Sequence, residues 1–321
     1  MPIAVISTGG TIASTNDPDG DASPELTGSD LVGAVPGLAD VAEIVTEDFS
    51  NVPSPHFTVE RMYDLTERVR TYDEDSSVDG VVITQGTDIL EESAYFLDCC
   101  YGGETPVVFT GAMRNATLAS PDGPGNMLAS VRTVKNDGVR GLGALVVFND
   151  RVAAARDVTK MNSMNPDTFR SPEFGPLATV DEDRVHWQRR PVDRTPNYDL
   201  ERAALNNDVR ALTTTADMSD SAIRAARDAP ALCLAATGAG HIPPGIIPAL
   251  EDLREDGVPI VATTRCPEGR LARRTYDFPG SEATLRRLDC HFSDRNLQKT
   301  RIETIVALAA GSLDEAFVHP D

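Results

Sequence analysis

The stretch IAVISTGGTIAS, residues 3–14, joins an apolar run to two adjacent glycines and a threonine. A run of small and β-branched residues that ends at Gly-Gly predicts a short buried strand followed by a turn. Gly9 and Gly10 permit backbone angles and close backbone contacts that a side chain would forbid. Two functions fit this turn locally, since it could cradle a phosphate group or present Thr11 as a nucleophile.

The glycines do not complete a phosphate-binding motif. The P-loop needs GxxxxGK[ST], and the dinucleotide fingerprint needs GxGxxG directly after the first strand. Gly9-Gly10-Thr11 matches neither pattern, and the segment 238–240 is a bare GxG. An isolated GGT is more often a structural turn than a site, so other motifs must support any functional assignment.

Short apolar runs alternate with amphipathic stretches along the chain. We expect strands at residues 3–7, 41–46, 80–84, 106–110 and 142–148, with helices at 58–70 and 89–99. Asp88 and Glu91 have the spacing of a capping box for the second helix. Alternating strands and helices, with strands that are almost entirely apolar, predict an α/β fold with a parallel sheet covered on both faces.

The pattern breaks up between residues 174 and 207, where prolines, charges and isolated aromatics replace it. A second α/β unit follows, with strands expected at 231–237 and 258–263 and helices at 219–227, 247–255 and 302–310. We therefore expect a larger N-terminal domain with a flavodoxin-like parallel sheet (1–185), a linker (186–208) and a smaller C-terminal α/β domain (209–321).

The chain is strongly acidic, with 50 acidic and 29 basic residues and a formal net charge of −21. This charge disfavours a nucleic-acid partner because phosphates would be repelled. The acidic residues are spread along the whole sequence, which is typical of a surface adapted to concentrated salt, so we expect a halophilic protein. Lysines occur only at positions 135, 160 and 299, and every other basic residue is arginine.

Cysteine and histidine usage indicates a reducing compartment and no metal. The five cysteines are an odd number without a CxxC motif, which predicts free and mostly buried thiols. The histidines are scattered without metal-ligand spacing. Apolar runs are too short for a membrane span, and no signal-type leader is recognisable. We expect a cytoplasmic protein that needs neither metal nor cofactor and binds no membrane.

Five motifs in order and register support the nucleophile interpretation: STGGTIAS (7–14), GVVITQGTDILEESAYFL (80–97), VVFTGAMR (107–114), SPDGPGN (120–126) and ARDVTKMN (155–162). With them, the chain resembles the bacterial-type L-asparaginase family, from residue 3 to about 180 and more loosely beyond. The resemblance implies an amidohydrolase that converts L-asparagine to L-aspartate and ammonia through a threonine acyl-enzyme, without a cofactor.

The resemblance also implies roles for individual residues. Thr11 matches the nucleophile, while Thr87 and Lys160 match the second threonine and the lysine of a Thr-Lys-Asp relay. Asp88 matches the aspartate of that relay and also receives the substrate ammonium. Ser54 matches the serine that holds the substrate α-carboxylate.

Backbone groups and a second subunit complete the implied site. N–H groups around Thr11 and Thr87 would form the oxyanion hole, and the expected substrate-binding set also includes Gly10, Gly86 and Ala112. His241 and Tyr276 align loosely with residues that relatives contribute across a subunit interface, which implies a homodimer or homotetramer.

The chemistry needs such a set for general reasons. A threonine hydroxyl is a weak nucleophile, so it requires a base within hydrogen-bond reach and donors for the developing oxyanion. A lysine can act as that base only when its pKa is depressed, and arginine cannot replace it. In a chain that otherwise uses arginine, Lys160 within a predicted site indicates proton transfer. Lys135 and Lys299 lack such a context, and we expect them on the surface.

Three positions depart from the family pattern. Gln85 stands where many relatives have histidine, Pro55 follows Ser54 where periplasmic members tend to have glutamine, and the lid tyrosine of those members is replaced near Leu26. The lid itself corresponds to residues 14–28, which are rich in glycine, proline and acidic residues. These departures leave open how Thr11 is polarised.

Structural roles and two other functions compete with this interpretation. Taken singly, Asp88 could be a helix cap, Thr87 a turn residue, Ser54 a loop hydroxyl and Lys160 half of a surface ion pair. The chain could also be the asparaginase-like subunit of an archaeal glutamyl-tRNA amidotransferase, or a non-catalytic amino-acid-binding module. The acidic charge and the strand that begins at residue 3 disfavour the first, and the presence of the full relay set disfavours the second.

The acid excess predicts that the fold gains stability between dilute buffer and molar KCl. At 1 M salt the screening length falls to about 3 Å, so repulsion between surface carboxylates is largely removed. Thermal melts across this range should show a rising midpoint together with rising activity. A midpoint that does not change with salt would contradict the halophilic interpretation.

Overall fold

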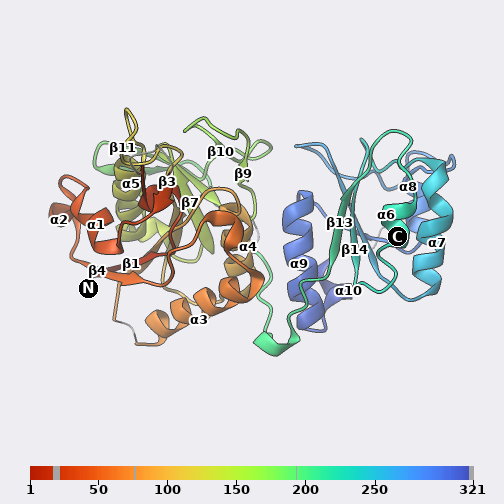
Figure 1. The fold of residues 1–321 in the computed structure, drawn as a ribbon, viewed down its shortest axis with the longest axis horizontal. Coiled ribbons are helices and arrows are strands. Elements are labelled where there is room, and N and C mark those ends of the chain that lie inside the picture. The colour runs from red at the N-terminus through yellow and green to blue at the C-terminus, as the bar shows by residue number, and fades with distance from the viewer. Residues whose placement is uncertain (17–21, 76, 193, 318–321) are drawn as a thin grey trace. The chain divides into compact units, whose positions relative to one another are not determined.

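The computed structural model describes residues 1–16, 22–75, 77–192 and 194–317. The chain divides into two compact units, Met1–Asn197 and Tyr198–Asp321. The division falls within the stretch 186–208 that the sequence suggests as a linker, although the sheet of the first unit continues to Trp187. Figure 1 shows the elements of each unit.

The first unit is built on a sheet of eight described strands in the order β12-β11-β8-β7-β6-β5-β1-β4. Five neighbouring strands are parallel, which confirms the expected α/β sheet: β1 (Ile3–Ser7), β4 (Ile44–Asp48), β5 (Gly80–Thr84), β6 (Val107–Thr110) and β7 (Ala144–Phe148). Numbered along the chain, this parallel set has the flavodoxin order 2-1-3-4-5.

The sheet is not parallel throughout. Three further strands extend it in antiparallel fashion beyond β7: β8 (Arg151–Ala154), β11 (Ala178–Asp181) and β12 (Arg184–Trp187). These strands are short and two of them carry exposed charged residues, so they lack the continuous apolar run that marks the central strands. The sheet is therefore mixed, with a parallel centre that carries the predicted site.

Helices cover both faces of this sheet. The helix α5 (Gly123–Lys135) packs on β5, β6 and β7, while α3 (Val59–Asp75) packs on α4 (Leu90–Cys100), which contacts β6 and β7. Figure 1 shows α3 and α4 on the face opposite α5. The sequence pattern did not predict α5, because it begins with Gly-Pro-Gly. Proline is tolerated in the first turn of a helix, where its missing N–H has no intrahelical partner.

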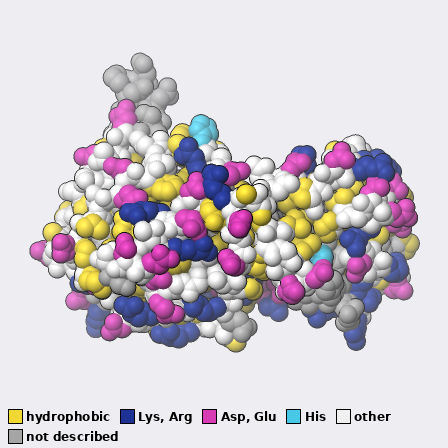
Figure 2. Space-filling view, turned by 90° about the horizontal axis from the view of Figure 1, so that it is seen from below, with side chains coloured by type: hydrophobic (Ala, Val, Ile, Leu, Met, Phe, Trp, Pro, Cys, Tyr) yellow, Lys and Arg dark blue, Asp and Glu magenta, His cyan; other side chains and the backbone are white. Residues whose placement is uncertain are grey.

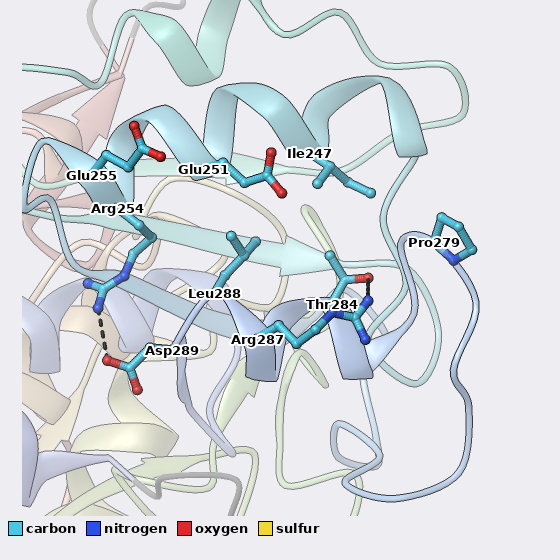
Figure 3. Close-up of a pocket in the computed structure, with 9 residues that line it drawn as sticks. All are labelled: Ile247, Glu251, Arg254, Glu255, Pro279, Thr284, Arg287, Leu288 and Asp289. Carbon is cyan, nitrogen blue, oxygen red and sulfur yellow. Dashed lines mark hydrogen bonds and ion pairs between the residues drawn. The ribbon is translucent and has the colours of Figure 1, made fainter.

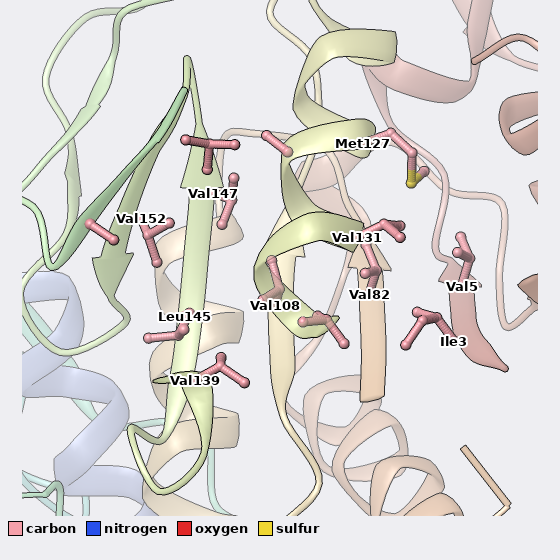
Figure 4. Packing of buried hydrophobic residues seen from close by; sticks show 14 of the residues in the cluster. Ile3, Val5, Val82, Val108, Met127, Val131, Val139, Leu145, Val147 and Val152 are labelled. Carbon is pink, nitrogen blue, oxygen red and sulfur yellow. The ribbon is translucent and has the colours of Figure 1, made fainter. Parts of the chain in front are cut away.

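The core beneath α5 is a row of side chains that runs across the parallel strands. Val5 pairs in register with Val82, Val82 with Val108, and Val108 with Leu145, and all four are fully buried. Figure 4 shows these residues with Met127 and other members of the same cluster. Each such side chain contributes roughly 1.5–3 kcal/mol through burial, so the sheet is a rigid support for the loops at its edge.

One expected strand is misplaced at the edge of the sheet. The stretch 41–46 was expected to be extended, but Val41 ends the short helix α2 (Leu38–Val41) and β4 covers Ile44–Asp48. β4 is an edge strand whose residues are partly exposed, so its sequence lacks the apolar run of a central strand. Apolar residues before β4 belong instead to α2, in which Leu38 is buried.

The second unit contains a smaller, wholly parallel sheet in the order β13-β14-β15-β16. Its strands are β13 (Arg210–Thr213), β14 (Leu232–Ala236), β15 (Ile260–Thr264) and β16 (His291–Phe292). Its helices are α6 (Ser221–Arg224), α7 (Ile247–Glu255), α8 (Glu282–Arg287), α9 (Leu297–Ala309) and α10 (Leu313–Ala316). Figure 1 shows α9 on one face of this sheet and α6 and α7 on the other.

The expectation that Lys299 lies on the surface is wrong. The helix α9 begins at Leu297, five positions before the expected start at 302, because the Asn296 side chain caps it by accepting a hydrogen bond from the Lys299 N–H (3.1 Å). The earlier start brings Lys299 into the helix, where it is 2% exposed. Lys135 remains exposed, as expected.

The cysteines are free, as the sequence predicts. Cys266 is exposed, whereas the other four are buried. Burial raises the pKa of Cys100, Cys233 and Cys290 to about 12, so these thiols are protonated near neutral pH.

The surface carries both signs of charge, and Figure 2 shows acidic and basic side chains interspersed over the face in view. None of the helices in the described part of the chain has the length and apolar character needed to cross a membrane. Nor do the described His, Cys, Asp and Glu side chains gather into a cluster that could hold a metal ion.

Candidate active site

The strand order locates the site before any side chain is considered. In a sheet of order 2-1-3-4-5, the connection from the first strand and the connection from the third strand run in opposite directions along the sheet. Ligands bind at the carboxyl ends of these two strands. These strands are β1 and β5, which pair from Ile3 with Gly80 to Ser7 with Thr84. Thr11 follows β1 and Thr87 follows β5, so both lie in the loops that begin at this point.

Glycines let the two loops touch backbone to backbone. A Cβ atom added to Gly10, whose φ is +84°, would lie 2.2 Å from the Gly86 Cα. A Cβ added to Gly86 would in turn lie 2.6 Å from the Ser54 Cβ. Real atoms cannot approach this closely, so only glycine fits at positions 10 and 86. The three loops that carry Thr11, Thr87 and Ser54 therefore pack into one layer.

Ser54 is locked to the second of these loops. It begins a 3-10 turn, Ser54–His56, and is buried. Its hydroxyl donates a hydrogen bond to the Gly86 carbonyl oxygen (2.6 Å) and accepts one from the Ile89 N–H (3.2 Å). The Ser54 oxygen is thus fixed beside the backbone on both sides of Thr87 and Asp88.

Lys160 completes the cluster from a distant part of the chain. It lies on β9 (Thr159–Lys160), which pairs with β10 (Phe169–Arg170). Its Nζ donates to the Thr87 Oγ1 at 2.9 Å and to the Asp88 Oδ1 at 2.8 Å. The Lys160 side chain is 16% exposed and that of Asp88 is 60% exposed. The ammonium therefore connects a buried hydroxyl with a carboxylate that faces solvent.

The capping box expected at Asp88 and Glu91 is not present. The helix α4 begins at Leu90, and its N-cap residue, Ile89, provides no side-chain cap. Asp88 points instead to Lys160. Glu91 is buried, and its carboxylate accepts hydrogen bonds from the Lys160 N–H and, at 3.2 Å, from the Thr159 hydroxyl. In the sequence, the spacing of Glu91 from Asp88 indicates only a helix cap and not this contact with β9.

Thr11 starts a 3-10 turn, Thr11–Ala13, that is held from behind by apolar packing. Ile12, Ala13 and Ala112 form a buried cluster with Leu31 and the partly buried Leu26. Ala112 thus supports the turn through its side chain. Gly10 contributes backbone here too, since its carbonyl accepts hydrogen bonds from the Ala13 N–H and the Ser14 hydroxyl.

Part of the expected lid, 14–28, falls on residues 17–21, outside the described residues. The flanking segments form a hairpin of β2 (Ser14–Asn16) and β3 (Ala22–Pro24). After the hairpin, the Leu26 N–H donates to the Ala13 carbonyl at 2.9 Å. Leu26, which was aligned with the lid tyrosine of relatives, therefore anchors the chain behind Thr11.

Gln85, another departure from the family pattern, is buried at the end of β5. Its Nε2 donates to the Ser93 hydroxyl at 2.8 Å. Its backbone N–H donates to the Thr110 carbonyl. Gln85 therefore ties the loop before Thr87 to the helix α4 that follows.

His241 and Tyr276 contact each other in the second unit. Their ring centroids are 4.8 Å apart in an edge-to-face arrangement, and Phe278 packs against both. Burial alone would raise the pKa of the underlying Glu282, but hydrogen bonds from the Tyr276 and Thr275 N–H groups (2.6 and 2.7 Å) and the nearby His241 hold it below its ordinary value. This carboxylate fixes the backbone that carries Tyr276.

A separate hollow of about 700 Å³ also lies in the second unit (Figure 3). It is bordered by one face of α7, with Ile247, Glu251 and Glu255, and by Arg287 and Leu288 on the other side. Its arginines are already paired, Arg254 with Asp289 at 2.9 Å and Arg287 with Asp277 at 3.0 Å. None of the site residues predicted from the sequence lines this hollow. Nothing therefore indicates that the hollow is the active site.

Comparison with known proteins gives the family. Residues 2–193 match the family described as Asparaginase, N-terminal, and residues 208–318 match the Glutaminase/Asparaginase C-terminal domain. The chain belongs to the asparaginase family. It is thus an amidohydrolase, and its two matched regions together span nearly the whole sequence.

Named relatives and a solved structure agree with this assignment. The chain is 32% identical to a glutaminase-asparaginase of Pseudomonas aeruginosa over 95% of this chain and 86% of that protein. It is 33% identical to an L-asparaginase of Bacillus licheniformis, over 96% and 95% of the two chains. The crystal structure of a probable cytoplasmic L-asparaginase from Campylobacter jejuni superimposes with a TM-score of 0.86 at 30% identity and covers 98% of both chains.

The contact between Gly10 and Gly86 predicts that Gly10→Ala is strongly destabilising. The new methyl group meets backbone, which cannot rotate away, and the positive φ is unfavourable for alanine; we expect a loss of about 2–4 kcal/mol in the free energy of unfolding. Denaturant unfolding of the purified variants measures this loss.

Gly125→Ala is the matched control. Gly125 lies inside α5 with open space around its Cβ position, so alanine should stabilise the helix by about 0.5–1 kcal/mol. Equal effects of the two substitutions would show that the Gly10 contact is not as tight as described.

Proposed function

We propose that the protein hydrolyses L-asparagine to L-aspartate and ammonia, with Thr11 as the nucleophile. The proposal rests on the hydrogen bonds from Lys160 to both Thr87 and Asp88. These bonds lie at the carboxyl edge of β5, beside the turn that presents Thr11. The names of the L-asparaginase relatives support this substrate.

The reaction has two steps in this proposal. The Thr11 oxygen attacks the side-chain amide carbon of asparagine, its proton passes to the amide nitrogen, and ammonia leaves as the Thr11 ester forms. Water then attacks the ester carbonyl, and aspartate and the free Thr11 hydroxyl are released. Both tetrahedral intermediates carry an oxyanion, for which the N–H groups around Thr11 and Thr87 would supply donors.

Lys160, Thr87 and Asp88 form the proton relay in this scheme. A deprotonated lysine could accept a proton through the Thr87 hydroxyl, to which it is already hydrogen-bonded. Asp88 would stabilise the ammonium that results. Both steps require proton transfer, so loss of the relay would slow turnover whichever step it serves.

The same layer of loops would bind the substrate. Ser54 would hold the α-carboxylate, while Asp88, exposed on its other side, would receive the α-ammonium. Gly10, Gly86 and Ala112 would shape the floor, the first two because only glycine leaves room between the loops. His241 and Tyr276 would join from a neighbouring subunit of a homodimer or homotetramer. This assembly remains a prediction, as do the cytoplasmic location and the halophilic character.

The relay predicts that Lys160→Arg abolishes most turnover although it keeps the positive charge. Arginine stays protonated to a pH beyond about 12 and cannot accept a proton. Loss of general-base catalysis typically lowers kcat by about 10²–10⁴-fold. Steady-state release of ammonia from L-asparagine in high salt measures kcat and KM, and a parallel series with L-glutamine tests substrate preference.

Lys135→Arg is the control for this experiment, because Lys135 is exposed and its Nζ donates to the Val41 carbonyl, away from the relay. Arginine can make the same contact, so its turnover should match that of the wild type. Lys299 cannot serve as a control because it is buried. A Lys160→Arg enzyme within about threefold of the wild type, far inside the general-base range, would refute the relay.

A further inference from the structure

We propose that Glu91 is the positioning residue that places Lys160 for catalysis, an inference that rests on the proposed function. Glu91 lies in the first turn of α4 and is 3% exposed. Its Oε2 accepts the hydrogen bond from the Lys160 N–H, and its Oε1 accepts the one from the Thr159 hydroxyl. The carboxylate thus holds the backbone of β9 rather than the cap of its own helix.

These bonds close a ring around the reacting groups. The chain runs from Thr87 and Asp88 directly into α4 and Glu91, crosses by hydrogen bond to the Lys160 backbone, and returns through the Lys160 Nζ to Thr87 and Asp88. Lys160 is therefore fixed at both ends, its backbone by Glu91 and its Nζ by the relay. β9 pairs only with the two-residue β10 among the described strands, so the ladder alone gives it little support.

The chemistry of a carboxylate explains why glutamate suits this position. An ionised carboxylate only accepts hydrogen bonds, and both of its oxygens here face donors. Glutamine has the same shape and its NH₂ group can donate to the Thr159 hydroxyl, but its neutral oxygen accepts a weaker hydrogen bond from the Lys160 N–H than a carboxylate does. The contact that holds the Lys160 N–H would weaken, and β9 would shift away from α4. A displacement of about 1 Å at a catalytic group can cost about 10²-fold in rate.

The test compares Glu91→Gln with Glu60→Gln in steady-state kinetics. Glu60 occupies the first turn of α3, so the control makes the same chemical change at an equivalent helix position away from β9. Glu91→Gln should lower kcat by about 10²-fold while KM changes little, because Ser54 and Asp88 remain in place. Glu60→Gln should stay within about twofold of the wild type.

A double variant separates positioning from general destabilisation. In a Lys160→Met background there is no amine left to position, so adding Glu91→Gln should cause no further loss of kcat. If the two substitutions lowered kcat multiplicatively in the double variant, the proposal would be overturned. A Glu91→Gln enzyme with the kcat of the Glu60→Gln control would also overturn it. If Glu91→Gln does not fold, Glu91→Asp replaces it, since it keeps both acceptors but falls one methylene short and should also lose kcat.

Hydrogen exchange gives a readout that does not depend on activity. The Lys160 amide should exchange slowly in the wild type and in Glu60→Gln, and faster in Glu91→Gln, because its acceptor is weakened. A wild type that releases no ammonia would defeat the proposed function, yet loss of Lys160 protection would still support the contact. Unchanged protection in Glu91→Gln would overturn the positioning role even in an active enzyme.

Discussion

The close packing of the Gly10 backbone on the Gly86 backbone is the contact on which the site depends. Parallel strands bring their carboxyl ends to one edge, but the chain ordinarily diverges beyond that edge into separate loops. Here the absence of side chains at positions 10 and 86 lets two loops and the Ser54 turn pack directly on one another. A third chain segment, β9, then needs to be held against this layer.

Glu91 and Lys160 provide that attachment. The helix α4 begins three residues after Thr87, so any residue in its first turn moves together with the Thr87 loop. Glu91 uses this position to bind β9, and Lys160 returns the contact to Thr87 and Asp88. Apolar packing of Ile12 and Ala112 supports the Thr11 turn on its other side. The reacting groups are therefore placed by short-range contacts on a rigid sheet.

The sequence predicts the centre of the fold well because central parallel strands are buried on both faces and read as apolar runs. β1, β5 and α7 lie where the pattern places them. The same reasoning fails at the edges, where β4 is partly exposed, and at α5, whose Gly-Pro-Gly start hides a helix. Lys299 was misjudged for a related reason, since a lysine's burial depends on tertiary neighbours that its local sequence does not reveal.

The candidate site, like the fold, could be predicted only in part from the sequence. Motifs identified Thr87, Asp88, Lys160 and Ser54, which the structure brings together: Lys160 bonds to Thr87 and Asp88, and Ser54 bonds to the backbone on both sides of them. Glu91 was not predicted as a site residue because its spacing from Asp88 also fits a capping box. Only the path of β9 distinguishes a cap from a contact with Lys160. A pattern of residues along the chain cannot specify which distant backbone a buried carboxylate will bind.

In the proposed mechanism, Thr11 is the group that is acylated. Rapid acid quenching of the enzyme with L-asparagine, followed by proteolysis and mass spectrometry, would locate an ester intermediate. We expect an aspartyl ester on Thr11, within the tryptic fragment 1–61, and no ester in a Thr11→Val variant. An ester on Thr87 instead, or a burst of ammonia without any ester, would contradict it.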